Sequence, residues 1–180
     1  DARIGGRGGD DLLVGGTGAD TLIGGTGFDC ADYSASGSAV TIDLATGTGS
    51  GGDAQGDRLE GIERLIGSAF GDGLTGDAFD NMLAGGAGAD RLTGGAGIDT
   101  ADYSASSAAV NAVLGGTGSS GDAEGDVLAD IENLIGSRFG DVLVGDGAVN
   151  ILSGGAGDAR LVLNGGADRL DGGVGVDVAD

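Results

Sequence analysis

Leucine recurs along this chain at intervals of nine residues, and an oxygen-bearing side chain usually stands two residues before it. Cutting the chain into nines gives fourteen nonapeptides, which start at residues 6, 15 and 24, then at 58, 67, 76, 85 and 94, and then at 127, 136, 145, 154, 163 and 172. Their eighth place always holds leucine or alanine, and 11 of the 17 leucines share this phase. Such recurrence predicts a repeat architecture.

The sixth place of the nonapeptides recurs with the same period as the leucines. In 13 of the 14 copies it carries a side-chain oxygen. The exception is segment 154–162, where Ala159 fills the sixth place and Asp158 falls one place early. The members are Asp11, Asp20, Asp29, Glu63, Asp72, Asn81, Asp90, Asp99, Glu132, Asp141, Asn150, Asp168 and Asp177.

Each nonapeptide predicts a turn followed by a short strand. Its glycines permit the positive φ of a tight turn, and its last three residues set one leucine between small or β-prone neighbours. A strand this short cannot bury its leucine alone, but pairs of strands stacked at roughly 4.8 Å enclose a thin aliphatic core. We therefore predict an all-β fold, a parallel β-roll (a right-handed β-solenoid) with 18-residue coils.

A second period of about 70 residues lies on top of the first, since Gly24 to Thr93 aligns with Gly94 to Val162. The predicted organisation is a first repeat block at 1–32, an irregular insert at 33–57, a second block at 58–102, an irregular insert at 103–126 and a third block at 127–180. Each insert is expected to add a strand, as at 40–44. Together they are expected to form one continuous solenoid from a longer array.

The net charge of −21 limits the partners of the chain. Eight basic residues stand against 29 acidic ones, which disfavours nucleic acid and anionic membranes, and no apolar stretch is long enough to span a bilayer. A single cysteine, Cys30, permits no intramolecular disulfide and no cysteine-rich zinc site. It aligns with Thr100, and we interpret it as a tolerated substitution. The natural electrostatic partner is a cation.

Stacking of the coils brings the sixth-place residues of every second nonapeptide together, and a divalent cation relieves the repulsion between their carboxylates. Calcium fits an oxygen-only cage with a flexible backbone better than magnesium, and zinc lacks its usual ligands. The predicted pairs include Asp11 with Asp29, Asp72 with Asp90, Asn81 with Asp99, and Asn150 with Asp168. The predicted metal ligands are Asp11, Asp20, Asp29, Asp72, Asn81, Asp90, Asp99, Asp141, Asn150, Asp168 and Asp177, and they hold several Ca²⁺ ions.

Two features of the inserts leave alternatives open. The acidic runs 52–57 and 121–126 are either extra calcium sites or solvated loop charge. Tyr33 and Tyr103 are expected to cap the core where Ala31 and Ala101 leave space, in preference to forming a carbohydrate platform. No residue is assigned a catalytic role, because histidine is absent and no base accompanies a serine or threonine.

The copies at Gly15 to Ile23 and Gly85 to Thr93 match the pattern G-G-x-G-x-D-x-U-x, and the chain resembles RTX (repeats-in-toxin, haemolysin-type) calcium-binding proteins over about 126 residues. The resemblance implies type I secretion in an unfolded state, ordering in external calcium, and a secreted or cell-surface location. It implies a calcium-triggered structural module of an extracellular bacterial protein. The 70-residue period favours an adhesin-like or surface-layer-like protein, and the absence of catalytic residues predicts that the chain is not an enzyme.

Other readings of this resemblance are an accessory C-terminal region of a secreted hydrolase, such as a protease or lipase, or of a polysaccharide-modifying enzyme. Sugar or ice binding on the sheet faces is disfavoured because Thr21, Thr75 and Thr93 are too sparse. Whether the partner is an extracellular surface or a second copy stays open.

Overall fold

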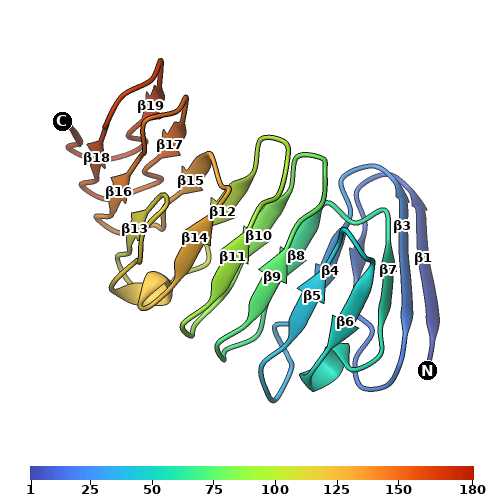
Figure 1. The fold of residues 1–180 in the computed structure, drawn as a ribbon. Coiled ribbons are helices and arrows are strands. Elements are labelled where there is room, and N and C mark those ends of the chain that lie inside the picture. The colour runs from blue at the N-terminus through green and yellow to red at the C-terminus, as the bar shows by residue number, and fades with distance from the viewer.

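The computed structural model describes all 180 residues, and it consists of short strands joined by turns. Figure 1 shows the coils stacked side by side along the molecule, with the amino terminus at one end and the carboxyl terminus at the other. Two short 3₁₀ helices interrupt the pattern, η1 (Gly52–Ala54) and η2 (Gly121–Ala123). No helix in the fold has the length and apolar character needed to cross a membrane.

The strands form three sheets, in each of which hydrogen-bonded neighbours follow one another in the order below. The first contains β1 (Arg3–Gly8), β3 (Thr21–Thr26), β7 (Arg58–Glu60), β6 (Thr48–Ser50), β5 (Thr41–Asp43), β9 (Gly73–Thr75), β11 (Arg91–Thr93) and β14 (Val127–Ala129). The second contains β19 (Arg169–Asp171), β17 (Ile151–Ser153), β15 (Asn133–Ile135), β12 (Thr100–Asp102), β10 (Met82–Ala84), β8 (Arg64–Ile66), β4 (Cys30–Asp32) and β2 (Leu12–Leu13). The third contains β13 (Asn111–Val113), β16 (Val142–Val144), β18 (Arg160–Val162) and β20 (Val178–Ala179).

Parallel pairing in the regular parts has the register that the nine-residue period predicts. Leu65 of β8 lies beside Leu83 of β10, and Leu74 of β9 lies beside Leu92 of β11. The partners are 18 residues apart in both cases, so two nonapeptides make one coil. The parallel β-roll expected from the sequence is confirmed.

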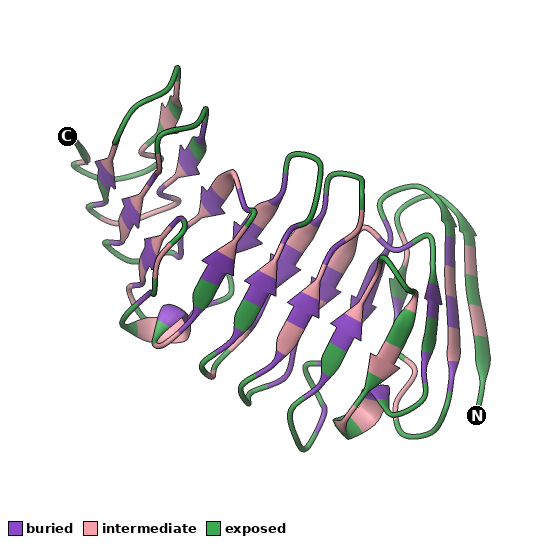
Figure 2. Ribbon diagram, in the orientation of Figure 1, coloured by how far each residue is buried: buried purple, intermediate pink, exposed green.

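The eighth-place residues form the core, as predicted, because their side chains point between the sheets. Figure 2 shows this buried row as the purple centre of successive strands. Burial weakens only at the carboxyl-terminal end, where Leu170 is partly buried and Ala179 is exposed. The buried members are Leu13, Leu22, Ala31, Leu65, Leu74, Leu83, Leu92, Ala101, Leu134, Leu143, Leu152 and Leu161.

The first insert departs from a purely parallel solenoid. The expected strand at 40–44 is present as β5, which pairs in parallel with β9, but β6 follows it and runs antiparallel to both β5 and β7. The chain thus first forms β5 beside β9, a strand that comes later in the sequence, and then returns through β6 to form β7 beside β3. The second insert repeats this path, with antiparallel bridges from Asn111 to Ser119 and from Thr117 to Val127.

Segment 58–66 differs from most of the other nonapeptides, because it holds two strands instead of a turn and a strand. β7 belongs to the first sheet and β8 to the second, and a short link with Gly61 at φ 59° joins them. The turn that precedes β7 lies in the insert, and Leu59 is buried in the leucine row. The nonapeptide pattern therefore resumes inside the insert, before residue 58, and not at the end that the sequence predicted. Segment 127–135, with β14 and β15, has the same arrangement.

Truncating a core leucine should destabilise the roll strongly. Leu83 is fully buried in β10, so Leu83→Ala should lower the free energy of unfolding by about 2–5 kcal/mol, measured by chemical denaturation in saturating calcium. Phe79→Ala is the matched control from the same nonapeptide, since Phe79 is 72% exposed, and it should change stability by about 0.5 kcal/mol or less. Equal losses for the two variants would contradict this core.

Candidate metal-binding turns

The sixth-place residues meet across neighbouring coils through one type of hydrogen bond. The stacked turns on one edge of the roll form a row, in which neighbouring sixth-place residues belong to consecutive coils. The backbone N–H of the sixth-place residue in one turn donates to a side-chain oxygen of the sixth-place residue in the next turn of the row, at 2.7–2.9 Å. Each accepting side chain therefore points toward the turn of the preceding coil. All four pairs predicted from the sequence are joined in this way, and they are Asp11 with Asp29, Asp72 with Asp90, Asn81 with Asp99, and Asn150 with Asp168.

Two aspartates in the inserts extend these rows, although the nine-residue phase did not include them. Asp57 Oδ1 accepts the N–H of Asp20 at 2.7 Å, and Asp126 Oδ1 accepts the N–H of Asp90 at 2.8 Å. Both lie in the acidic runs whose role the sequence left open. The signal that could have found them is the D-x-L spacing of Asp57 and Leu59, which matches the sixth and eighth places of a nonapeptide.

Glu63 and Glu132 occupy equivalent positions in the other row. Glu63 Oε2 accepts the N–H of Asp29, and Glu132 Oε2 accepts the N–H of Asp99, both at 2.8 Å. The rows of acidic residues therefore continue past both inserts.

Tyr33 and Tyr103 are buried in the core and do not form an exposed platform. Only 2% of Tyr33 and 3% of Tyr103 is exposed, and their hydroxyls donate to Asp57 Oδ2 at 3.0 Å and to Asp126 Oδ2 at 2.9 Å. The expected capping role is confirmed, and the carbohydrate alternative is wrong because the rings face the interior. Each tyrosine also satisfies the second oxygen of the aspartate that extends the row.

Five sixth-place aspartates keep one buried oxygen without any hydrogen-bond donor. The side chains of Asp29 and Asp99 are fully buried, and those of Asp20 and Asp90 are 2% exposed. Leaving a buried carboxylate oxygen unpaired costs free energy, so such a group calls for a cation. The atoms concerned are Asp11 Oδ2, Asp20 Oδ2, Asp29 Oδ2, Asp90 Oδ2 and Asp99 Oδ2.

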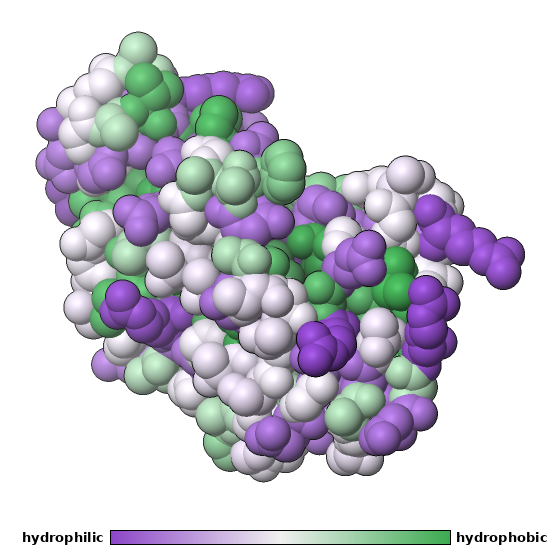
Figure 3. Space-filling model, turned by 45° about the vertical axis from the view of Figure 1, so that its right-hand side comes forward, coloured by the Kyte–Doolittle hydropathy of each residue, from purple (hydrophilic) through white to green (hydrophobic).

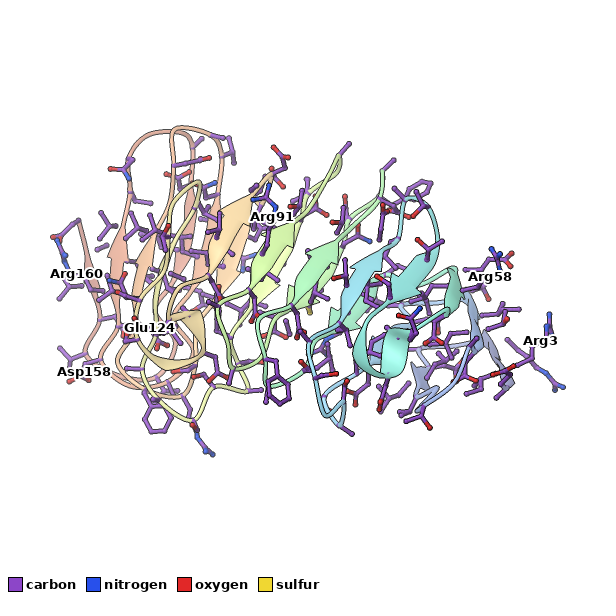
Figure 4. All side chains as sticks on the ribbon, turned by 60° about the horizontal axis from the view of Figure 1, so that its bottom comes forward. Arg3, Arg58, Arg91, Glu124, Asp158 and Arg160 are labelled. Carbon is purple, nitrogen blue, oxygen red and sulfur yellow. The ribbon has the colours of Figure 1, made fainter.

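Arginine does not supply the missing charge. The two arginine ion pairs join Arg64 to Asp102 at 2.8 Å and Arg160 to Asp180 at 2.5 Å, and neither reaches a sixth-place residue. Figure 4 shows the labelled Arg3 and Arg58 on the outside of the roll, pointing away from the strands. Figure 3 likewise shows strongly hydrophilic side chains standing out from a surface of small, pale residues. No arginine therefore neutralises the sixth-place carboxylates of the turns.

The first glycine of a nonapeptide makes room for the sixth-place side chain and for a carbonyl of the next turn. A methyl group on Gly24 would overlap the Asp29 side chain and the Gly61 carbonyl oxygen, and a methyl group on Gly94 would overlap Asp99 and the Asp130 carbonyl oxygen. Carboxylate and carbonyl oxygens thus converge where only glycine fits. The two positions correspond to one another in the 70-residue period.

This donor set fits a hard cation. No three acidic, cysteine or histidine side chains converge closely enough to hold a metal ion by themselves, so an ion in a turn would take many of its ligands from backbone carbonyls. Calcium accepts six to eight oxygen ligands in flexible geometries, including backbone carbonyls, whereas zinc and softer metals prefer nitrogen and sulfur. The turns therefore suit calcium.

Burial raises the pKa values of several carboxyl groups in these rows. The pKa of Asp90 is raised from 3.8 to about 8, first by burial and then by the nearby charges of Asp126 and Asp72. Burial is also the first cause for Asp99 and Asp126, whose pKa values are each raised to about 6, and for the raised pKa of Asp57. Each shift reports a carboxylate that is costly to ionise until a cation accompanies it.

The remaining predicted ligands lie in the same rows with different surroundings. Asp72, Asn81, Asp141 and Asn150 accept hydrogen bonds from their own turns. Near the carboxyl terminus Asp177 Oδ1 accepts the N–H of Ala159 at 2.9 Å, so the row continues there although Ala159 brings no oxygen. Asp168 and Asp177 are partly exposed.

Cys30 is buried, and burial raises the pKa of its thiol to about 11. A thiol with this pKa stays protonated at neutral pH and is a poor nucleophile or metal ligand. This environment agrees with the interpretation of Cys30 as a tolerated substitution.

Stacked glycine-rich turns with inward-facing carboxylates, closed over a leucine core, define a calcium-binding parallel β-roll. The family model of the RTX calcium-binding nonapeptide repeat (4 copies) matches residues 4–29, 66–101, 128–161 and 144–179. The chain belongs to this family, whose nonapeptides bind Ca²⁺, and it is a structural calcium-binding module. A search of curated proteins gave no match.

The raised pKa of Asp90 predicts an inverted pH dependence in calcium-depleted buffer. Because the pKa is about 8 in the fold and 3.8 for an unperturbed aspartate, protonation of Asp90 contributes stability that is fully present below about pH 4 and is lost as pH rises through about 8. In calcium-depleted buffer the fraction of folded protein, followed by far-ultraviolet circular dichroism, should therefore fall between about pH 5 and pH 8. Asp90→Asn should flatten this change, since it removes the titrating group.

In saturating calcium the folded fraction should not fall between about pH 5 and pH 8, because the bound ion favours the ionised carboxylate over the protonated one. A folded fraction that rises with pH in calcium-depleted buffer would show that the carboxylates are not buried as described.

Proposed function

We propose that the chain is a calcium-triggered folding and spacing module, in which the sixth-place aspartates with an unpartnered buried oxygen are the principal ligands. The observation that carries the proposal is the repeated juxtaposition of such an oxygen with a turn carbonyl, as at Asp29 and Asp99. Bound calcium supplies the positive charge that these oxygens lack. The proposed ligands are Asp11, Asp20, Asp29, Asp90 and Asp99, with Asp168 and Asp177 continuing the rows.

The charge of the chain supports a calcium-dependent fold. At low calcium a chain with net charge −21 repels itself, and its stacked carboxylates are buried without counter-ions. A site filled at ten times its dissociation constant adds about 1.4 kcal/mol, so five sites add about 7 kcal/mol. Domain stabilities of about 5–15 kcal/mol are of the same size, and calcium therefore decides whether the roll is folded.

Such a device suits a protein that is exported unfolded and meets calcium outside the cell. RTX repeat proteins are typically exported by type I secretion, and we propose that route and an extracellular or cell-surface location for this chain. The 70-residue period supports an extended adhesin-like or surface-layer-like protein over a compact enzyme tail. In this role the chain contributes length and rigidity and no catalytic group.

A calcium titration followed by far-ultraviolet circular dichroism tests the proposal. The signal of β structure should be weak in calcium-depleted buffer and should appear cooperatively as calcium is added in the range typical of extracellular modules, about 0.1–1 mM. Magnesium at the same concentrations should not reproduce the transition, because its shorter bonds and strict octahedral geometry fit a carbonyl cage poorly. Full β structure after exhaustive calcium removal would refute the proposed role.

A further inference from the structure

Nine of the glycine-rich turns, those that end at or before residue 150, are of two kinds, and the difference lies at the second place. In the open turns, 6–11, 15–20, 24–29, 85–90 and 94–99, the second residue has positive φ, for example 115° at Gly25 and 107° at Gly95. In the closed turns, 67–72, 76–81, 136–141 and 145–150, it is a serine or an aspartate with negative φ. The backbone amide of the second residue therefore has a different orientation in the two kinds.

In every closed turn this amide donates to the side chain of the sixth residue. Ser137 N–H donates to Asp141 Oδ2 at 2.6 Å, and the Ser137 hydroxyl donates to Asp141 Oδ1 at 2.8 Å. Ser68 makes the same pair of bonds to Asp72. The first oxygen of each aspartate also accepts a backbone N–H from the preceding insert, from Val110 and Val40 respectively. Both oxygens are thus already satisfied by the protein.

The other two closed turns have asparagine in the sixth place. Asn81 Oδ1 accepts the Asp77 N–H at 2.7 Å, and Asn150 Oδ1 accepts the Asp146 N–H at 2.9 Å. The amide nitrogen of Asn150 donates to the Glu132 carbonyl oxygen of the neighbouring coil at 3.0 Å, and that of Asn81 donates to the Glu63 carbonyl at 3.5 Å. The asparagine is uncharged, and it presents a donor to the carbonyl that a cation would otherwise bind.

The buried oxygens without donors follow the same division. All five belong to the open turns, and the closed turns have none. A closed turn therefore has no buried side-chain oxygen without a donor for an ion to stabilise, and calcium would have to displace two or more hydrogen bonds to reach its sixth residue.

We infer that the sixth-place side chains of the closed turns bind no calcium, and that the protein's own donors take the place of the ion there. This inference rests on the proposed function and refines it. The closed turns are consecutive, so each pair makes one complete coil, at 67–84 and at 136–153. Calcium sites are then grouped in clusters, with a metal-free coil between one cluster and the next in the 70-residue period.

The number of calcium ions bound per chain tests this inference, measured by equilibrium dialysis with metal analysis on the 180-residue chain. Asp72→Asn and Asp99→Asn are a matched pair, with the same substitution in a closed and an open turn. Asp99→Asn should lose one bound ion or weaken that site at least tenfold. Asp72→Asn should keep the wild-type number of ions while its thermal midpoint falls.

Asn81→Asp adds a carboxylate to a closed turn, and it should leave the number of ions unchanged. Ser68→Ala is the milder variant if Asp72→Asn fails to fold, since it leaves the carboxylate in place and removes only the Ser68 hydroxyl, which donates to Asp72 and accepts the Phe70 N–H at 3.2 Å. It should lower the thermal midpoint by about 2–4 °C, which corresponds to the loss of about one hydrogen bond, with no change in the ions bound.

The inference is overturned if Asp72→Asn or Ser68→Ala loses an ion, or if Asn81→Asp gains one, while wild type binds calcium as proposed. If wild type itself binds no calcium, the proposed function fails. The two failures are therefore distinguishable in one set of measurements.

Discussion

The structure depends on how stacked turns handle buried carboxylate oxygens. Parallel coils repeat every 18 residues, so the acidic side chain of one turn can lie next to that of the following coil, as Asp72 lies next to Asp90. Without compensation this stacking would set like charges against each other in a poorly solvated environment. The leucine core is thin and cannot offset many such electrostatic costs. The hydrogen bonds of the turns are therefore directed largely at these carboxylate oxygens.

Four of the five sixth-place aspartates of the open turns, Asp20, Asp29, Asp90 and Asp99, divide their two oxygens between two tasks. In Asp29 and Asp99, Oδ1 accepts a backbone N–H from the adjacent coil, while Oδ2 stays free beside a turn carbonyl. The hydrogen bond to Oδ1 orients the side chain toward the adjacent coil. The second oxygen is left for a cation, so the folding of the coil and the assembly of the site are the same event.

The sequence predicted the repeated parts well because their physics is local. Leu83 and Asp99 could be placed from the nine-residue phase alone, since a turn and a three-residue strand are each determined within one nonapeptide. The inserts were harder, because the antiparallel return of β6 and the position of Asp57 depend on pairing with β3 and β5, which are remote in sequence. The closed turns were missed for another reason, since the phase gives the residue type at Asp72 but not the direction of the Ser68 amide.

A crystal structure with a lanthanide in place of calcium would test the central claim most directly, because anomalous scattering locates each ion. The account predicts ions beside Asp29 Oδ2 and Asp99 Oδ2, at about the 2.3–2.6 Å typical of calcium ligands, with turn carbonyls completing the coordination. Ions bound only on the outer faces of the sheets, with those two oxygens paired to protein donors, would contradict it.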